Sequence, residues 1–162
     1  MGTQVAEGGI LDYQIIIPSQ ASSTEKQAAQ QLQHYLSQLS ANPIQIAEEG
    51  KSADKNGIYI GQSDYAKNKK INFGELPEAG FSNKSAGNNF IIAGGAKKGL
   101  LFGVYDLLEG LGFKKYSPDH ANIPKAKTLN FDKSGKTFAP KIRYRTTSYS
   151  QMADQEYSDW HK

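Results

Sequence analysis

The chain has no cysteine among its 162 residues and no long hydrophobic run. The absence of cysteine excludes disulfide frameworks, thiolate metal sites and cysteine nucleophiles. No window approaches the 18 or so consecutive apolar residues of a membrane-spanning helix, so no contact with a membrane is expected. The first residues also lack the basic start and apolar stretch of a signal peptide.

Charge of one sign is also scarce, because 19 basic residues are nearly balanced by 16 acidic ones. A net charge of +3 without a dense basic cluster does not predict binding to nucleic acid. The three histidines, His34, His120 and His161, are far apart in the sequence and have no metal-ligand spacing. We therefore expect no metal site and no cofactor.

The N-terminal part of the chain predicts a central strand followed by a helix. Residues 10–17 end in the continuous apolar run Ile15–Ile17, which is typical of a strand that is buried on both faces. Ser22 and Glu25 have the spacing of a capping box, and apolar residues follow at helical spacing. The pattern predicts a helix over residues 24–39.

Shorter elements are predicted in the middle of the chain. Residues 44–46 and 57–61 read as two short strands, and residues 90–93 read as a third. Between them, residues 62–89 are mostly polar. We expect a long surface excursion there, with at most one helical turn near residues 64–67.

A second amphipathic helix is predicted over residues 99–109, where leucine and valine recur at spacings of three and four. Its carboxylates, Asp106 and Glu109, are interpreted as part of a solvated face, because no partner acid, base or metal ligand is visible nearby. The preceding glycines, residues 94–99, lack the spacing of a phosphate loop and indicate a packing turn rather than an anion site. Further strands are expected at residues 113–116 and 128–131.

Two helices with one apolar stripe each, together with about six strands, predict an α+β fold. Both helices should pack on one face of a mixed β-sheet, which gives a two-layer sandwich.

The segment GLLFGVYDLLEGLGFKKYSP, residues 99–118, resembles a recurring motif of a known domain. This is the N-terminal, non-catalytic α/β domain that precedes the barrel in α-glucuronidase-type and β-hexosaminidase-type glycoside hydrolases, with a fold like domain 2 of chitobiase. The family pattern is G-x-L-Y-G-V-Y-x-L-L-E-x-L-G-x-R-W-Y-x-P. Lys114 and Lys115 stand where the family has Arg-Trp, and Phe102 replaces the common tyrosine.

The C-terminal part resembles the start of a barrel in the same enzymes. Pro140, Ile142, Tyr144 and Arg145 loosely match a P-R-F-x-W/Y-R-G pattern. Residues 1–9 have nothing to bury, so we expect them to be a disordered lead-in. The resemblance implies an accessory domain at 10–139 and a linker with the truncated start of a (β/α)8 barrel at 140–162. It also implies that Arg145 contacts hydroxyls of a bound sugar in the longer parent; an exposed linker arginine is the alternative.

Catalytic barrels carry their working residues at the ends of several strands, so this chain alone is not expected to be an enzyme, and no catalytic residue is assigned. The resemblance implies an accessory domain that buttresses the missing C-terminal barrel of a glycoside hydrolase, with a glycan as a further possible partner. It also implies a periplasmic or extracellular location. An autonomous carbohydrate-binding module is the alternative, and it predicts an exposed row of aromatic side chains on one sheet face. A small hydrolase is a third hypothesis, which requires turnover by this chain alone.

Overall fold

The computed structural model describes residues 7–9, 12–40, 42–51, 56–96, 98–125, 128–130, 136–141 and 153–161. Its centre is a six-stranded mixed sheet with the strand order β10-β5-β6-β4-β2-β3. The strands are β2 (Tyr13–Ile17), β3 (Ile46–Glu48), β4 (Asn56–Ile60), β5 (Phe81–Ala86), β6 (Asn89–Gly94) and β10 (Lys136–Phe138). Strands β3, β2, β4 and β6 run parallel, whereas β5 is antiparallel to both β6 and β10.

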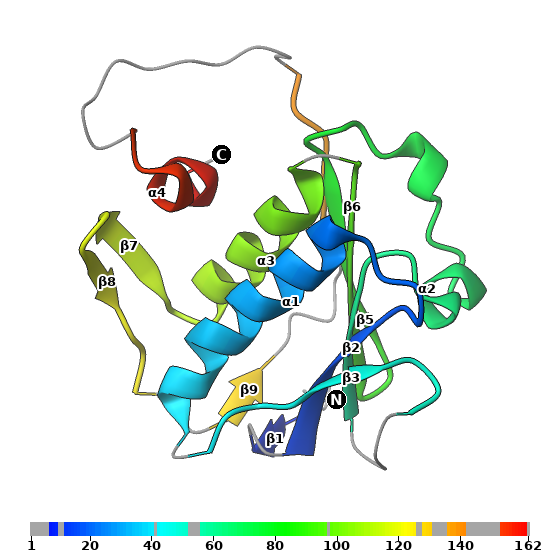
Figure 1. Ribbon diagram of the computed structural model, residues 1–162, viewed down its shortest axis with the longest axis horizontal. Coiled ribbons are helices and arrows are strands. Elements are labelled where there is room, and N and C mark those ends of the chain that lie inside the picture. Colours follow the sequence, from blue (N-terminus) through cyan, green and yellow to red (C-terminus); the bar gives the residue numbers. More distant parts are fainter. Residues whose placement is uncertain are drawn as a thin grey trace, which may run out of the picture.

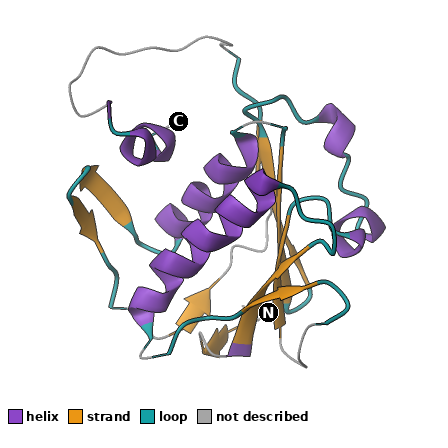
Figure 2. Cartoon of the chain, in the orientation of Figure 1, coloured by secondary structure: helices purple, strands orange, loops and turns teal. Residues whose placement is uncertain are grey.

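Two long helices, α1 (Ser23–Leu36) and α3 (Gly99–Gly110), lie side by side on one face of this sheet (Figures 1 and 2). Helix α1 continues into the short 3-10 turn η2 (Ser37–Leu39). The predicted two-layer α+β sandwich, with both helices on the same face, is therefore confirmed.

The core lies between the sheet and the two helices. Alternate residues of β2, β4 and β6 point toward the helices and pack against the apolar stripes of α1 and α3. Together they form one buried cluster that includes Ile15, Ile58, Ile92, Leu32 and Val104. This cluster is what holds the two layers together, because apolar burial is the dominant favourable term in folding.

The start of α1 follows the sequence prediction. Ser22 is the N-cap, its side chain accepts a hydrogen bond from the backbone N–H of Glu25, and the Glu25 carboxylate accepts one in return from the Ser22 N–H. This capping box satisfies backbone donors that the helix itself leaves free.

The predicted excursion at residues 62–89 is only partly correct. It contains the short helix α2 (Asp64–Asn68) and the 3-10 turn η3 (Phe73–Glu75), as a surface segment would. It also contains β5, which pairs with β6 along its whole length and belongs to the main sheet. Tyr65 of α2 stacks on Tyr59 of β4, with 4.1 Å between the ring centroids, on the sheet face opposite the long helices.

Two of the expected strands form separate small sheets. Strand β7 (Lys114–Ser117) pairs with β8 (His120–Asn122), and β9 (Thr128–Asn130) pairs with β1 (Glu7–Gly9). Residues 7–9 fall in the region that we expected to be a disordered lead-in, yet they form β1. Residues 7–9 have no large apolar side chain to bury, but their backbone hydrogen bonds to β9 are enough to form a strand.

The last described element is α4 (Gln155–Trp160), which contacts α3 and β7 (Figure 1). Helix α4 lies within residues 140–162, where the sequence predicts a linker and the truncated start of a barrel. Its Trp160 is buried against this domain and is part of the core cluster. Within the described residues, no helix is long and apolar enough to span a membrane.

Candidate functional site

The most elaborate arrangement of side chains surrounds α4. Trp160 is 1% exposed, and its ring centroid lies 5.1 Å from that of Tyr35 and 4.9 Å from that of Tyr105. Phe113 completes the cluster, with its ring 5.7 Å from Tyr35 in an edge-on arrangement. The rings come from α1, α3, α4 and the segment before β7, so this aromatic box joins parts of the chain that are distant in sequence.

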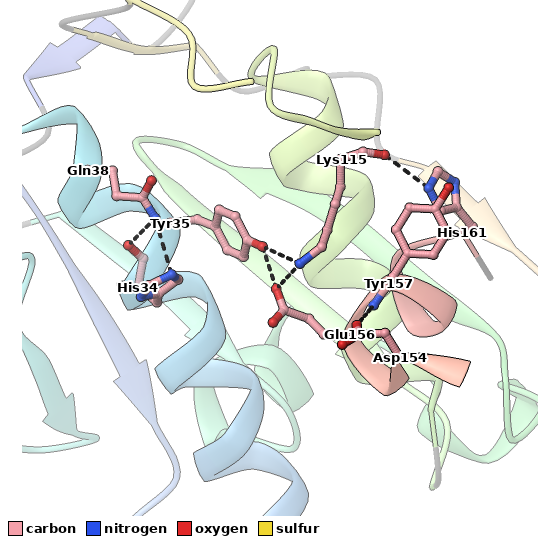
Figure 3. A network of polar contacts seen from close by, with 8 residues as sticks. All are labelled: His34, Tyr35, Gln38, Lys115, Asp154, Glu156, Tyr157 and His161. Carbon is pink, nitrogen blue, oxygen red and sulfur yellow. Dashed lines mark hydrogen bonds and ion pairs between the residues drawn. The ribbon is translucent and has the colours of Figure 1, made fainter. Parts of the chain in front are cut away.

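Tyr35 of the aromatic box also belongs to a polar network around the buried Lys115 (Figure 3). The Lys115 ammonium is 2.8 Å from Oε1 of Glu156, and the Tyr35 hydroxyl donates a hydrogen bond to the same oxygen. The ammonium also lies 3.4 Å from the Tyr35 hydroxyl. The side chain of Lys115 is only 6% exposed, whereas that of Glu156 is 36% exposed. A lysine this deeply buried needs a charged partner, and α4 supplies it.

The contacts of this network shift the pKa values of Glu156 and Tyr35 in opposite directions. Burial works to raise the pKa of Glu156, but the hydrogen bonds from Lys115 and Tyr35 and the positive charge of Lys115 outweigh it, so the pKa is lowered. Burial raises the pKa of Tyr35, and the hydrogen bond to the Glu156 carboxylate raises it further. Glu156 is therefore held as a carboxylate and Tyr35 as a neutral phenol.

Helix α4 also binds the backbone of β7. The Tyr157 hydroxyl donates to the carbonyl of Tyr116 at 3.3 Å, and Nε2 of His161 lies 3.0 Å from the carbonyl of Lys115. One turn after Glu156, Asp159, which is mostly buried, forms an ion pair of 2.7 Å with Lys98, the N-cap residue of α3. Two ion pairs, two backbone contacts and one buried tryptophan thus fix α4 on the domain.

The carboxyl ends of the parallel strands are the usual ligand-binding edge of such a sheet, at the point where strand order reverses. Here that point lies between β2 and β4, and the carboxylate of Glu25 fills it. Its Oε1 accepts from the backbone N–H of Gln62 at 2.8 Å, while its Oε2 accepts from Ser22. Glu49 similarly accepts from the backbone N–H groups of Asp64 and Tyr65 at the start of α2. The chain's own carboxylates therefore occupy both helix starts.

The glycine turn before α3 is a packing turn, as the sequence predicted. A Cβ atom on Gly95 would collide with the carbonyl oxygen of Pro77, and one on Gly99 would collide with that of Gly80. Close backbone approach accounts for these glycines without a bound anion.

The two carboxylates of α3 are not a solvated pair. The side chain of Asp106 is 11% exposed and forms an ion pair with Lys136 of β10, and Asn83 donates to it at 3.5 Å. Asp106 thus ties the helix to the edge of the sheet, while Glu109 is exposed. In the part of the chain that the structure describes, no group of three or more metal-ligating side chains could hold a metal ion.

The sequence-predicted sugar contact, Arg145, lies outside the described residues. Sequence reasoning missed Lys115, Glu156 and Trp160 as a connected set. One signal was available, because Lys115 takes the place of a tryptophan in the motif, and a lysine at a buried strand position calls for an acidic partner.

These observations define an α+β domain whose C-terminal helix is docked by a tryptophan and two ion pairs. The chain belongs to the family described as glycosyl hydrolase family 67 N-terminus, whose model matches residues 11–107, more than half of the chain.

One solved structure with a similar fold is described as a "GH138 enzyme targeting pectin rhamnogalacturonan II". The two are 17% identical with a TM-score of 0.50, and the match covers 80% of this chain but 12% of that chain. At this identity the likeness shows a shared fold. No curated protein sequence matches the chain.

Proposed function

We propose that this chain is the N-terminal accessory domain of a larger glycoside hydrolase of the α-glucuronidase or β-hexosaminidase type. In this proposal the catalytic carboxylates lie on a downstream (β/α)8 barrel, and the present domain buttresses that barrel. The chain itself performs no hydrolysis, and its location is periplasmic or extracellular. The membership of the N-terminal family supports this function.

The docking of α4 is the structural observation that carries the proposal. Trp160, Glu156 and Asp159 anchor α4, so this segment of the chain has a fixed position against the layer formed by α1 and α3. Domains that are joined through an anchored segment keep a defined relative orientation, whereas a free linker permits independent motion. A buttressing role requires the first of these.

The carboxylates of this domain support the same division of labour. Glycoside hydrolysis normally needs two carboxyl groups about 5–9 Å apart across the sugar, one of which acts as an acid. Glu25, Asp106 and Glu156 are all held by donors of the domain itself. None of them is presented to a substrate as part of such a pair.

The autonomous carbohydrate-binding module is less favoured. It predicts a row of exposed aromatic side chains, but among the described residues the exposed large hydrophobic side chains are Tyr116 and Ile123. One exposed aromatic ring does not make a row.

The sequence that follows Lys162 in the gene tests the proposal directly. A βα repeat pattern with two acidic residues at strand ends supports it, and a stop codon directly after Lys162 contradicts it. At the protein level, glycosidase activity should be found in the longer parent and should be absent from the present 162 residues.

The role proposed for Arg145 can be tested in the same parent enzyme. Its guanidinium offers several donors in a plane, which suits contact with sugar hydroxyls. The change Arg145→Ala should raise KM for the glycoside by about tenfold, equivalent to the loss of about 1.4 kcal/mol of binding. An unchanged KM would remove Arg145 from the substrate site.

A further inference from the structure

The outward face of the β7–β8 hairpin carries the most exposed large hydrophobic side chain of the described residues. Along β7, Lys114 and Tyr116 are exposed, while Lys115 between them is buried. His120 and Asn122 are exposed on β8. Tyr116 is 61% exposed. Lys114 is paired with Asn122, and His120 lies two residues before Asn122 on the same side of β8. The strand register is interrupted at Tyr116, but its ring stacks on that of His120, so these four exposed side chains share one face, which we call the hairpin face.

The hairpin face is exposed but ordered. The ring of Tyr116 stacks on that of His120, with 6.1 Å between centroids and 29° between planes. Lys114 and Asn122 are paired in the strand register. From behind, α4 holds the hairpin through the hydrogen bond from the Tyr157 hydroxyl to the Tyr116 carbonyl. A preordered site loses less conformational entropy when it binds.

The chemistry of this face suits a sugar better than a protein partner. A tyrosine ring offers an apolar surface to the C–H groups of a pyranose, and its polar end stays in water. Lys114 and Asn122 add an ammonium and an amide, both of which donate hydrogen bonds. The cores of protein interfaces are depleted in lysine, so a lysine beside the central aromatic ring argues against a protein partner.

We propose that the hairpin face binds one pyranose ring of a glycan, stacked on Tyr116 and bonded by Asn122 and Lys114. The only carboxylate between residues 114 and 122 is Asp119, which lies in the turn next to His120. The positive end of the face is therefore at Lys114, and a pyranose that carries a carboxylate is the preferred ligand. This proposal rests on the proposed function, since it makes the domain an auxiliary contact for the glycan of its parent.

The affinity of such a site is low. One aromatic ring and a few exposed hydrogen bonds support a Kd of about 1 mM or weaker. That strength suits an auxiliary contact that adds to a stronger site elsewhere in the same protein, and it explains how one ring can function without a row of aromatics.

The test is a titration of this chain by NMR with trigalacturonate and, as the neutral counterpart, galactotriose. Trigalacturonate should shift the amide signals of residues 114–122 with a Kd of roughly 1–5 mM, and galactotriose should bind at least about threefold more weakly because it has no charge for Lys114. The change Tyr116→Ala should weaken binding of trigalacturonate by about fivefold or more, and Tyr116→Phe should preserve it.

Two matched controls lie in the same region. Ile123→Ala removes the other exposed apolar side chain, and Lys125→Ala removes an exposed lysine beyond β8. Neither should change the affinity, whereas Lys114→Ala should abolish the preference for the acidic sugar. Because Tyr116 and Lys114 are exposed, their variants should keep the thermal stability of the parent chain.

The proposal is overturned if neither sugar shifts residues 114–122 at about 20 mM, well above the expected Kd, or if Ile123→Ala weakens binding as much as Tyr116→Ala. Equal binding of the two sugars would overturn the role of Lys114. Protection of Tyr116 from nitration in a longer parent without glycan would also overturn the whole proposal, because another part of the protein would then cover the hairpin face. Since the titration uses this chain alone, its failure leaves the accessory function intact.

Discussion

Replacement of Glu156 by glutamine isolates the charge that holds α4 on the domain. Glutamine has nearly the same shape and keeps an oxygen that can accept from Tyr35, so the main change is the loss of the negative charge beside Lys115. The Lys115 side chain is 6% exposed, and without that charge its ammonium stays buried with only neutral partners. The loss of unfolding free energy should lie between that for breaking an exposed ion pair and that for breaking a fully buried one, because Glu156 itself is 36% exposed.

We expect Glu156→Gln to lower the free energy of unfolding by about 2 kcal/mol. Lys115→Met should cost less, because the carboxylate that remains is partly hydrated and the methionine is apolar. The double variant should therefore be more stable than Glu156→Gln alone, which is the signature of a coupled pair in a double-mutant cycle. Urea unfolding at neutral pH provides the three measurements.

Trp160 fluorescence can report on the docking of α4, and the exposed ion pair of Glu48 provides a control. Trp160 is the only tryptophan, so its fluorescence reports directly on the docking of α4. Glu156→Gln should increase quenching by acrylamide. Glu48→Gln breaks an ion pair of similar length, 2.7 Å to Lys51, whose side chains are 44% and 77% exposed. It should have no measurable effect. If both variants behave alike, or if Trp160 stays protected in Glu156→Gln, the argument is refuted.

Three further predictions follow from the same contacts. Trp160→Ala should lower the unfolding free energy by about 3 kcal/mol, and a calorimetric Tm within about 2 °C of the parent would show that the docked helix contributes little. Gly61→Ala should destabilise more than Gly87→Ala in urea, because both glycines have positive φ but only at Gly61 would the new Cβ also collide with Glu25; equal losses would leave backbone strain as the whole cause. The pKa of Glu156 is lower in the folded state, so its contribution is present above its ordinary pKa of 4.5 and is lost as pH falls through the folded value; the Trp160 emission should redshift there, and Glu156→Gln should lack that step.

Elements with a complete local signal were predicted well. The capping box and apolar stripe indicated a helix at residues 24–39, and the structure has α1 and η2 over Ser23–Leu39. The helix expected at 99–109 is α3, Gly99–Gly110. The strands at 57–61 and 90–93 match β4 and β6 to within one residue at each end. These elements lie at the centre of the fold, where burial and periodicity agree.

Strand β5 was missed because its sequence, FSNKSA, reads as polar. It lies between β6 and the short edge strand β10, and one of its faces is open enough to leave Lys84 exposed. On the other face Asn83 is buried, but its amide donates to the carbonyl of Gly103 at 2.9 Å. This hydrogen bond to a residue twenty positions away allows a polar side chain to be buried in the core. Hydrophobic periodicity cannot reveal such a partner.

The docking site was missed for a related reason. The Tyr35 hydroxyl reaches Glu156 across 121 residues of sequence, and Lys115 reaches it across 41. Each residue alone has an ordinary interpretation, as a helix tyrosine, a strand lysine and a surface acid. Only the fold brings them together, so the sequence could indicate that Lys115 needed a partner but not which one.

The behaviour of the acidic groups argues for a structural role of the domain. A glycosidase acid must keep its proton near neutral pH, which requires a raised pKa. The carboxyl groups with a clear shift, Glu48 and Glu156, both have lowered pKa values because lysines bind them. Glu25 closes the carboxyl edge of the sheet, and Asp159 anchors α4 through Lys98. In the described part of the chain, the buried carboxylates hold helices in place, which supports the accessory role that we propose.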